Sequence, residues 1–174
     1  MQKATLAGGC FWCVEAVFQE VKGVNKVVSG YSGGHTNDPK YEEITGSGHA
    51  EAVEITFDPK IISYKELLQI FYYVHDPTTL NRQGNDVGEQ YRSVIFYISE
   101  EQRKTAEDVT KNFAPTLWDK PIVTEITKLE KFWPAENYHQ NFYKNNPAQP
   151  YCQVVINPKL EKFRKRFMSL LKSH

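Results

Sequence analysis

The sequence has no long hydrophobic run. No stretch approaches the ~18 consecutive apolar residues that indicate a membrane-spanning helix, and the first residues, MQKATLAGG, lack the apolar core of a secretory signal peptide. Cysteine is also scarce: three residues in 174 cannot form the dense disulfide framework of a small secreted protein. We therefore expect a cytoplasmic protein that does not contact membranes and whose thiols serve chemistry or metal binding.

An excess of charge of either sign is also absent. Lys and Arg number 21, as do Asp and Glu, so the formal net charge is zero. Without a basic surface for phosphates, nucleic acid is not an expected partner. The glycine-rich stretch GYSGGHTNDP (30–39) lacks the Lys-Ser/Thr pair of a phosphate-binding loop, so no nucleotide is expected. The length fits a single catalytic domain over residues 1–174.

Hydrophobic periodicity predicts the order of the structural elements. Ser63 with Glu66, and Ser99 with Gln102, form capping boxes that predict two helix starts. The order predicts an α+β fold, a two-layer sandwich of split βαβ (ferredoxin-like) type with additional helices and a basic C-terminal helix. Two long connections with few apolar residues, 32–49 and 76–91, are candidates for functional loops. Strands are expected over 3–7, 24–31, 50–57, 91–98 and 122–129, and helices over 11–21, 64–75, from 100 onward, 134–143 and 157–174.

The stretch GGCFWC (8–13) places Cys10 and Cys13 around a Phe-Trp pair where a helix is expected to begin. At a helix start, free backbone N–H groups and the helix dipole favour a thiolate. The two glycines leave the approach to the sulfur of Cys10 open. The pattern favours a nucleophile at Cys10 over a small buried thiol.

A C-x-x-C pair has three interpretations. A zinc site needs two more ligands, and the remaining Cys152 and scattered histidines do not supply a second pair, so no metal and no zinc-stabilised module is expected. A general thiol–disulfide oxidoreductase could use Cys10 and Cys13 as its redox pair. A sulfoxide- or peroxide-reducing thiol would instead need a separate resolving cysteine. The aromatic residues between the two cysteines suit a small apolar group better than a broad protein surface.

Several blocks in the chain carry a family resemblance. GGCFW (8–12), GYSGG (30–34), YEEITGSGHAEAVEITFDP (41–59), HDPTTLNRQGNDVGEQYRS (75–93) and AENYHQNFY (135–143) together resemble the A-type methionine sulfoxide reductases. The resemblance implies an enzyme that repairs proteins after oxidative damage by reducing methionine S-sulfoxide, protein-bound or free. It implies no bound cofactor and an external dithiol reductant such as thioredoxin.

The resemblance also implies roles for individual residues. Cys10 would attack the sulfoxide sulfur and become a sulfenic acid. Phe11 and Trp12 would form the wall that holds the S-methyl group. Glu51 would give the sulfoxide oxygen a proton, which requires a carboxylic acid that stays neutral near pH 7 because it is buried or lies near another carboxylate.

Three further residues complete the implied site. Tyr41 and Tyr91 would donate hydrogen bonds to the sulfoxide oxygen without carrying charge, and Asp86 would help to orient the site. By composition alone, the tyrosines could be core residues and Asp86 a turn residue. We interpret His49 and His139 as structural or supporting residues.

The chain departs from the family pattern at the positions that concern recycling. Cys13 stands where many members have Gly, Glu89 where many have Thr, and a single cysteine, Cys152, replaces the common C-terminal pair. Cys13 and Cys152 are both candidates for the resolving cysteine. The sequence slightly favours Cys152, because the Pro-rich stretch NNPAQPY before it suggests a mobile terminal loop.

Overall fold

The computed structural model describes residues 1–172, which form a mixed sheet with strand order β7-β6-β1-β3-β2-β8. Strands β1 and β2 both pair antiparallel with β3, so they run parallel to each other with β3 between them. β6 pairs antiparallel with the other edge of β1. This arrangement is the split βαβ order, and it confirms the predicted α+β fold. The strands are β1 (Gln2–Gly8), β2 (Val24–Ser32), β3 (Ala50–Phe57), β6 (Ser93–Tyr97), β7 (Glu125–Lys128) and β8 (Phe132–Pro134).

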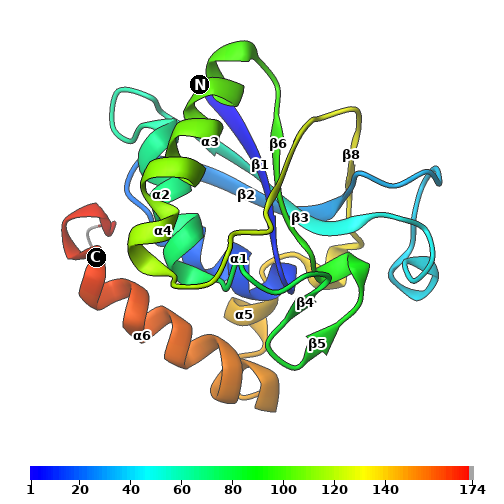
Figure 1. Ribbon diagram of the computed structural model, residues 1–174. Coiled ribbons are helices and arrows are strands. Elements are labelled where there is room, and N and C mark those ends of the chain that lie inside the picture. The colour runs from blue at the N-terminus through cyan, green and yellow to red at the C-terminus, as the bar shows by residue number, and fades with distance from the viewer. Residues whose placement is uncertain (173–174) are drawn as a thin grey trace.

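Helices cover one face of the sheet. In Figure 1, α1 and α2 lie against the strands, α3 and α4 lie beside α2, and α6 runs along α1 and α2. Both predicted N-caps are confirmed, and Ser63 forms the full capping box with Glu66. Ser99 accepts the N–H of Gln102, but the second box is incomplete, because the side chain of Gln102 accepts the N–H of Ile98 (3.1 Å) in place of that of Ser99. The helices are α1 (Phe11–Phe18), α2 (Tyr64–Val74), α3 (Glu100–Asn112), α4 (Ala114–Leu117) and α6 (Asn157–Arg166).

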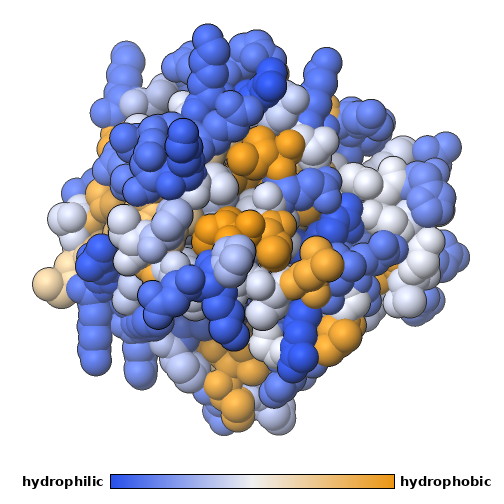
Figure 2. Space-filling model, viewed as in Figure 1, coloured by the Kyte–Doolittle hydropathy of each residue, from blue (hydrophilic) through white to orange (hydrophobic). Residues whose placement is uncertain are grey.

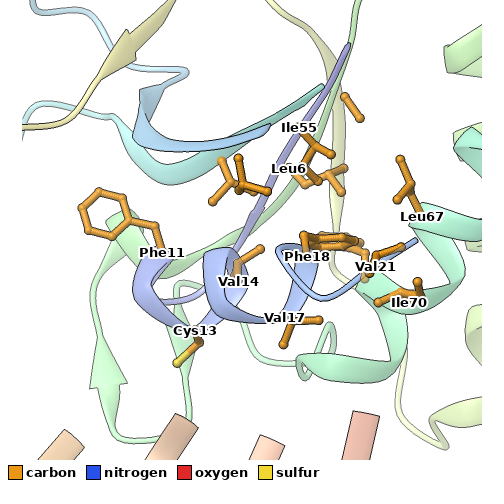
Figure 3. Close-up of a cluster of buried hydrophobic side chains, with 14 of the residues drawn as sticks. Leu6, Phe11, Cys13, Val14, Val17, Phe18, Val21, Ile55, Leu67 and Ile70 are labelled. Carbon is orange, nitrogen blue, oxygen red and sulfur yellow. The ribbon is translucent and has the colours of Figure 1, made fainter. Parts of the chain in front are cut away.

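The main core lies between the sheet and helices α1 and α2. Figure 3 shows Leu6 and Ile55 from the strands meeting Phe18 of α1 and Leu67 of α2, all fully buried. Burial of each such side chain contributes about 1.5–3 kcal/mol to folding. The side chain of Cys13 points away from this cluster, on the side of α1 that faces away from the sheet (Figure 3). The outer surface seen in Figure 2 is mostly hydrophilic, with hydrophobic side chains in separate groups.

The predicted helix over 134–143 is wrong. Pro134 ends strand β8, and only two short helical segments follow, η3 (Asn137–His139) and α5 (Phe142–Asn145). The side chain of Gln140 interrupts the helix because it accepts the N–H of Ser29 (2.9 Å) and donates to its carbonyl (2.8 Å). Asn141 then adopts a left-handed conformation with φ of 55°. The segment is therefore fastened to β2 by a side chain.

The predicted C-terminal helix has different limits. It starts earlier, as the π-helical segment η4 (Cys152–Ile156) that runs directly into α6, and α6 ends at Arg166. A short 3-10 turn, η5 (Met168–Leu170), follows. The expected helix extended to residue 174, and residues 173–174 lie outside the described part of the chain.

In Figure 1 the first long connection (32–49) lies at the right, and the second (76–91) lies at the lower right. The first contains η1 (Tyr41–Glu43), and the second contains a hairpin of β4 (Arg82–Gln83) and β5 (Asp86–Val87), followed by η2 (Glu89–Tyr91). The N–H of Gly48 donates to the carboxylate of Glu89 at 3.2 Å, so the residue that replaces the family's common Thr links the two connections.

Candidate active site

Cys10 stands at the N-cap of α1, where its side chain is 9% exposed and makes no capping hydrogen bond. The preceding Gly9 has φ of +94°, a conformation that favours glycine. A Cβ at Gly9 would lie 2.6 Å from Cγ of Gln83, so the missing side chain lets the hairpin pack directly on this turn. Gln83 in turn bonds both backbone groups of Asp76 at 2.9 Å. The hairpin is thereby held beside Cys10.

The two neighbouring thiols have opposite pKa shifts. Burial raises the pKa of Cys10 well above its ordinary value, and the neighbouring Cys13 thiol and Glu51 carboxyl group raise it further. The neighbouring thiol of Cys10 lowers the pKa of Cys13 to about 7. The hydroxyl oxygen of Tyr151 lies 3.6 Å from the sulfur of Cys13. The expectation that the helix start holds Cys10 as a thiolate is wrong for this state, because burial, Cys13 and Glu51 outweigh the backbone N–H of Trp12, which lowers the pKa of Cys10.

Glu51 comes from β3 and is 1% exposed. Its Oε1 accepts the backbone N–H of Phe11 at 3.1 Å, which ties the sheet to the start of α1, while its Oε2 has no partner among the described residues. Burial raises the pKa of Glu51 to about 8, and Asp86 and Cys13 add to the shift. The carboxyl group is therefore mostly neutral near pH 7, and its second oxygen is buried without a hydrogen-bond partner among the described residues.

Tyr41, Tyr91 and Asp86, from the two long connections, lie beside this carboxyl group and are half-buried. Burial, followed by the nearby Glu51, raises the pKa of both phenols. Asp86 accepts the hydroxyl of Tyr151 at 2.8 Å. The structure thus brings the three residues together with Cys10 and Glu51, and both phenols stay protonated at neutral pH.

Phe11 and Trp12 differ in burial. Phe11 is fully buried and packs on the rings of Tyr31 (centroids 5.6 Å apart) and His139 (5.0 Å). Trp12 is half-buried and stacks on Phe142, with centroids 3.7 Å apart and an interplanar angle of 5°. The two residues form an aromatic wall that begins directly at Cys10.

Glu136 and Tyr151, which the sequence did not assign to the site, support it together with His139. Glu136 accepts the N–H of Tyr41 (3.1 Å) and the hydroxyl of Tyr31 (3.0 Å), and so holds the first connection. Tyr151 joins Asp86 to Cys13. His139, which we interpreted as a structural or supporting residue, contacts the aromatic wall directly. Glu136 and His139 belong to the block AENYHQNFY, but only their contacts distinguish them from their neighbours.

His49 has the structural role expected. One ring nitrogen accepts the N–H of Gly34 at 3.1 Å, and the other lies 2.8 Å from the carbonyl of Thr36. These bonds shape the first connection just before Glu51.

The expectation of a mobile loop around Cys152 is wrong. Cys152 is 0% exposed, and burial raises its pKa. Together with Ile156, Leu160 and Phe163 it forms one buried face of the helical run that packs on α1 and α2. The spacing of these residues is helical, and Pro158 lies where the π-helical segment η4 passes into α6.

Residues 1–172 show neither a metal-binding cluster nor a membrane-spanning helix. They contain no cluster of three or more His, Cys, Asp or Glu side chains that could hold a metal ion. Within the same residues, no helix has both the length and the apolar character needed to cross a membrane.

The site combines a buried thiol pair at a helix start with a neutral carboxyl group, two phenols and an aromatic wall. These features are typical of a thiol-based oxidoreductase. The family model for peptide methionine sulfoxide reductase matches residues 2–171. The chain therefore belongs to the peptide methionine sulfoxide reductase family, and it catalyses the reduction of methionine sulfoxide in peptides. The family assignment excludes the alternative of a general thiol–disulfide oxidoreductase.

Relatives and solved structures agree with this assignment. The peptide methionine sulfoxide reductase MsrA of Chromobacterium violaceum is 56% identical over 176 residues, which cover 99% of this chain and all of the relative. Reduced Mxr1 from Saccharomyces cerevisiae is 31% identical with a TM-score of 0.80, over 87% of this chain and 88% of that one. Mxr1 in complex with Trx2, 24% identical with a TM-score of 0.57 over 81% and 84%, shares the fold.

Proposed function

We propose that Cys10 is the nucleophile of a single catalytic domain that reduces methionine S-sulfoxide, either free or within proteins. The observation that carries this assignment is the free Oε2 of Glu51, a buried and mostly neutral carboxyl oxygen beside Cys10. A sulfoxide oxygen leaves poorly until it is protonated, so a neutral acid next to a thiol fits this reaction. Methionine is released, and the oxygen remains on Cys10 as a sulfenic acid.

The surrounding residues divide the remaining tasks. Tyr41 and Tyr91 donate hydrogen bonds to the sulfoxide oxygen while Glu51 supplies the proton. Asp86 orients the site, supported by its bond to Tyr151. The S-methyl group lies against the wall formed by Phe11 and Trp12. This division makes the pocket chiral, because the sulfoxide oxygen and the S-methyl group each bind to a different set of residues.

The chirality is tested with the two epimers of methionine sulfoxide, supplied separately with a dithiol reductant. We expect turnover of the S epimer and no measurable turnover of the R epimer, because the R epimer would exchange the oxygen with another substituent in the pocket. The measurement is the amount of methionine released, resolved by chromatography. Equal rates for the two epimers would contradict the proposed arrangement.

For recycling we propose that Cys13 attacks the sulfenic acid of Cys10, which forms a Cys10–Cys13 disulfide and releases water. The support is the closeness of the two residues, since the N–H of Cys13 donates to the carbonyl of Cys10 at 3.1 Å. The pKa of Cys13, lowered to about 7, also favours its thiolate. Cys152 is the weaker candidate because it is fully buried in a helical segment. This choice reverses the preference drawn from the sequence.

The reductant of that disulfide is an external dithiol of the thioredoxin class. Mxr1, which is similar to this chain, has been crystallised with Trx2, and this supports the choice. We propose that the enzyme needs no bound cofactor or metal and works in the reducing cytoplasm, where such dithiols keep cysteines available.

The choice between the two cysteines is tested by a matched pair of variants. Cys13→Ser should release one equivalent of methionine normally but lose most of its thioredoxin-driven cycling, because the sulfenic acid has no neighbouring thiol. Cys152→Ser should retain most of its cycling. Mass spectrometry after one equivalent of substrate should find the Cys10–Cys13 bridge in the wild type. A Cys10–Cys152 bridge as the main product would show that Cys152 is the resolving residue.

A further inference from the structure

Tyr138 is exposed where the other large aromatic side chains are not. Among the Phe, Trp and Tyr residues of positions 1–172, it is the only one with an exposed side chain, at 58%. Tyrosine combines a large apolar ring with a polar tip, and for this reason it is enriched at interfaces with other molecules. The exposure of this one ring therefore needs an explanation other than core packing.

The ring of Tyr138 is held in one position although it is exposed. Its hydroxyl donates to Oε2 of Glu136 at 3.1 Å, and its ring packs on that of His139 with centroids 4.2 Å apart. The same Oε2 accepts the backbone N–H of Tyr41 at 3.1 Å. One carboxylate thus fixes both the exposed ring and the backbone of a tyrosine of the site.

A continuous series of rings joins Tyr138 to the active site. The centroid of the His139 ring lies 4.2 Å from that of Tyr138, 4.7 Å from that of Tyr41 and 5.0 Å from that of Phe11. Phe11 is 0% exposed and His139 is 1% exposed, so the series runs from the buried wall to the surface at Tyr138. Tyr138 therefore lies at the outer end of the aromatic wall.

A methionine sulfoxide within a protein enters this site with its side chain only. When its S-methyl group lies against Phe11 and Trp12, the peptide chain on either side of the residue stays outside, at the surface where the series of rings ends. A side chain next to the methionine sulfoxide is then within reach of Tyr138. Free methionine sulfoxide has no neighbouring residue and cannot make this contact.

We propose that Tyr138 is a specificity-determining residue: its exposed ring contacts the residue next to the methionine sulfoxide in a peptide chain, and so favours peptide-bound over free substrate. The gain is largest for an apolar or aromatic neighbour, because such a side chain buries the most apolar area on the ring. The inference rests on the proposed function of the site. Tyr138 takes no part in the transfer of the sulfoxide oxygen.

The test measures kcat/KM for free methionine S-sulfoxide and for two short blocked peptides in which the same residue is flanked by Phe or by Gly. Tyr138→Ala should lower the ratio of the Phe-flanked peptide to the free amino acid roughly two- to tenfold, the worth of one aromatic contact. The Gly-flanked peptide should show a smaller change in its ratio, because it offers no side chain to the ring. Thermal unfolding verifies that the variant folds.

The ratio separates this role from a structural one. If Tyr138 only supported Tyr41 through Glu136, its loss would lower kcat/KM for all three substrates alike and leave the ratios unaltered. Tyr138→Phe keeps the ring but removes the hydroxyl, so it should retain most of the wild-type ratio.

Ile98→Ala is the matched control. Ile98 is 50% exposed and follows β6 at the opposite end from Ser93, which pairs with Gly8 beside the site. Removal of its exposed side chain should not change the ratio. The proposal is overturned if Tyr138→Ala leaves the ratio unchanged, if Tyr138→Phe lowers it as much as Tyr138→Ala, or if Ile98→Ala lowers it equally.

The free amino acid distinguishes failure of this inference from failure of the proposed function. If the wild type reduces neither the free nor the peptide-bound S-sulfoxide, the proposed function itself is refuted. If the wild type reduces both and Tyr138→Ala leaves their ratio unchanged, only the role of Tyr138 is refuted.

Discussion

Cys10→Ser is expected to reduce the release of methionine from methionine sulfoxide to background. A serine hydroxyl has almost the same size as a thiol but is a far weaker nucleophile at neutral pH, and nothing in the site activates a hydroxyl at this position. The side chain makes no capping hydrogen bond, so the start of α1 should not depend on it. The measurement is methionine formed in a single turnover, with circular dichroism to verify the fold.

Cys13→Ser is the matched control for this experiment. It makes the same atomic change one helical turn away and should still release one equivalent of methionine. Substantial turnover by Cys10→Ser, or equal loss in both variants, would remove Cys10 as the nucleophile.

Glu51→Gln is expected to slow the first, sulfoxide-reducing step by about 10²- to 10⁴-fold, the usual contribution of a general acid. The amide oxygen can still accept the N–H of Phe11, which Glu51 accepts at 3.1 Å, so the geometry at the start of α1 should persist. What is lost is the proton for the sulfoxide oxygen. Single-turnover release of methionine measures this step separately from recycling.

The same residue predicts a pH dependence. Because the pKa of Glu51 is raised to about 8, the proton needed by the substrate is present below that pH and is lost as the pH rises through it. The single-turnover rate of the wild type should therefore fall above about pH 8. Glu51→Gln should lack this decline, because its amide does not titrate in this range.

Glu54→Gln offers a control on the same strand. Glu54 lies three positions along β3, and its side chain pairs with Lys3 at 3.4 Å on the opposite face of the sheet. This change should leave the single-turnover rate unaltered. A wild-type rate in Glu51→Gln would contradict the role of general acid.

Local sequence determined most of the elements. Alternating apolar residues specify β3, and the pairs Ser63–Glu66 and Ser99–Gln102 mark the starts of α2 and α3 because capping bonds involve residues close in the chain. The motif around Cys10 likewise depends on neighbouring residues, so its place at the start of α1 could be predicted. The error over 134–143 has the opposite origin: the bonds from Gln140 to Ser29 span 111 positions and replace local helical bonds.

The sequence by itself determined the α+β class, the helix start at Cys10 and, through the family resemblance, the set of residues that gather around it. Only the tertiary structure decided their electrostatic states, since burial raises the pKa of Cys10 and Glu51 and no local pattern reports burial across several elements. It also decided that Cys152 is buried, because the prolines near it suggested a loop while the packing of α6 on α1 and α2 made a helix. The contact of Trp12 with His139 joins residues 127 positions apart, and such a bond follows from the fold alone.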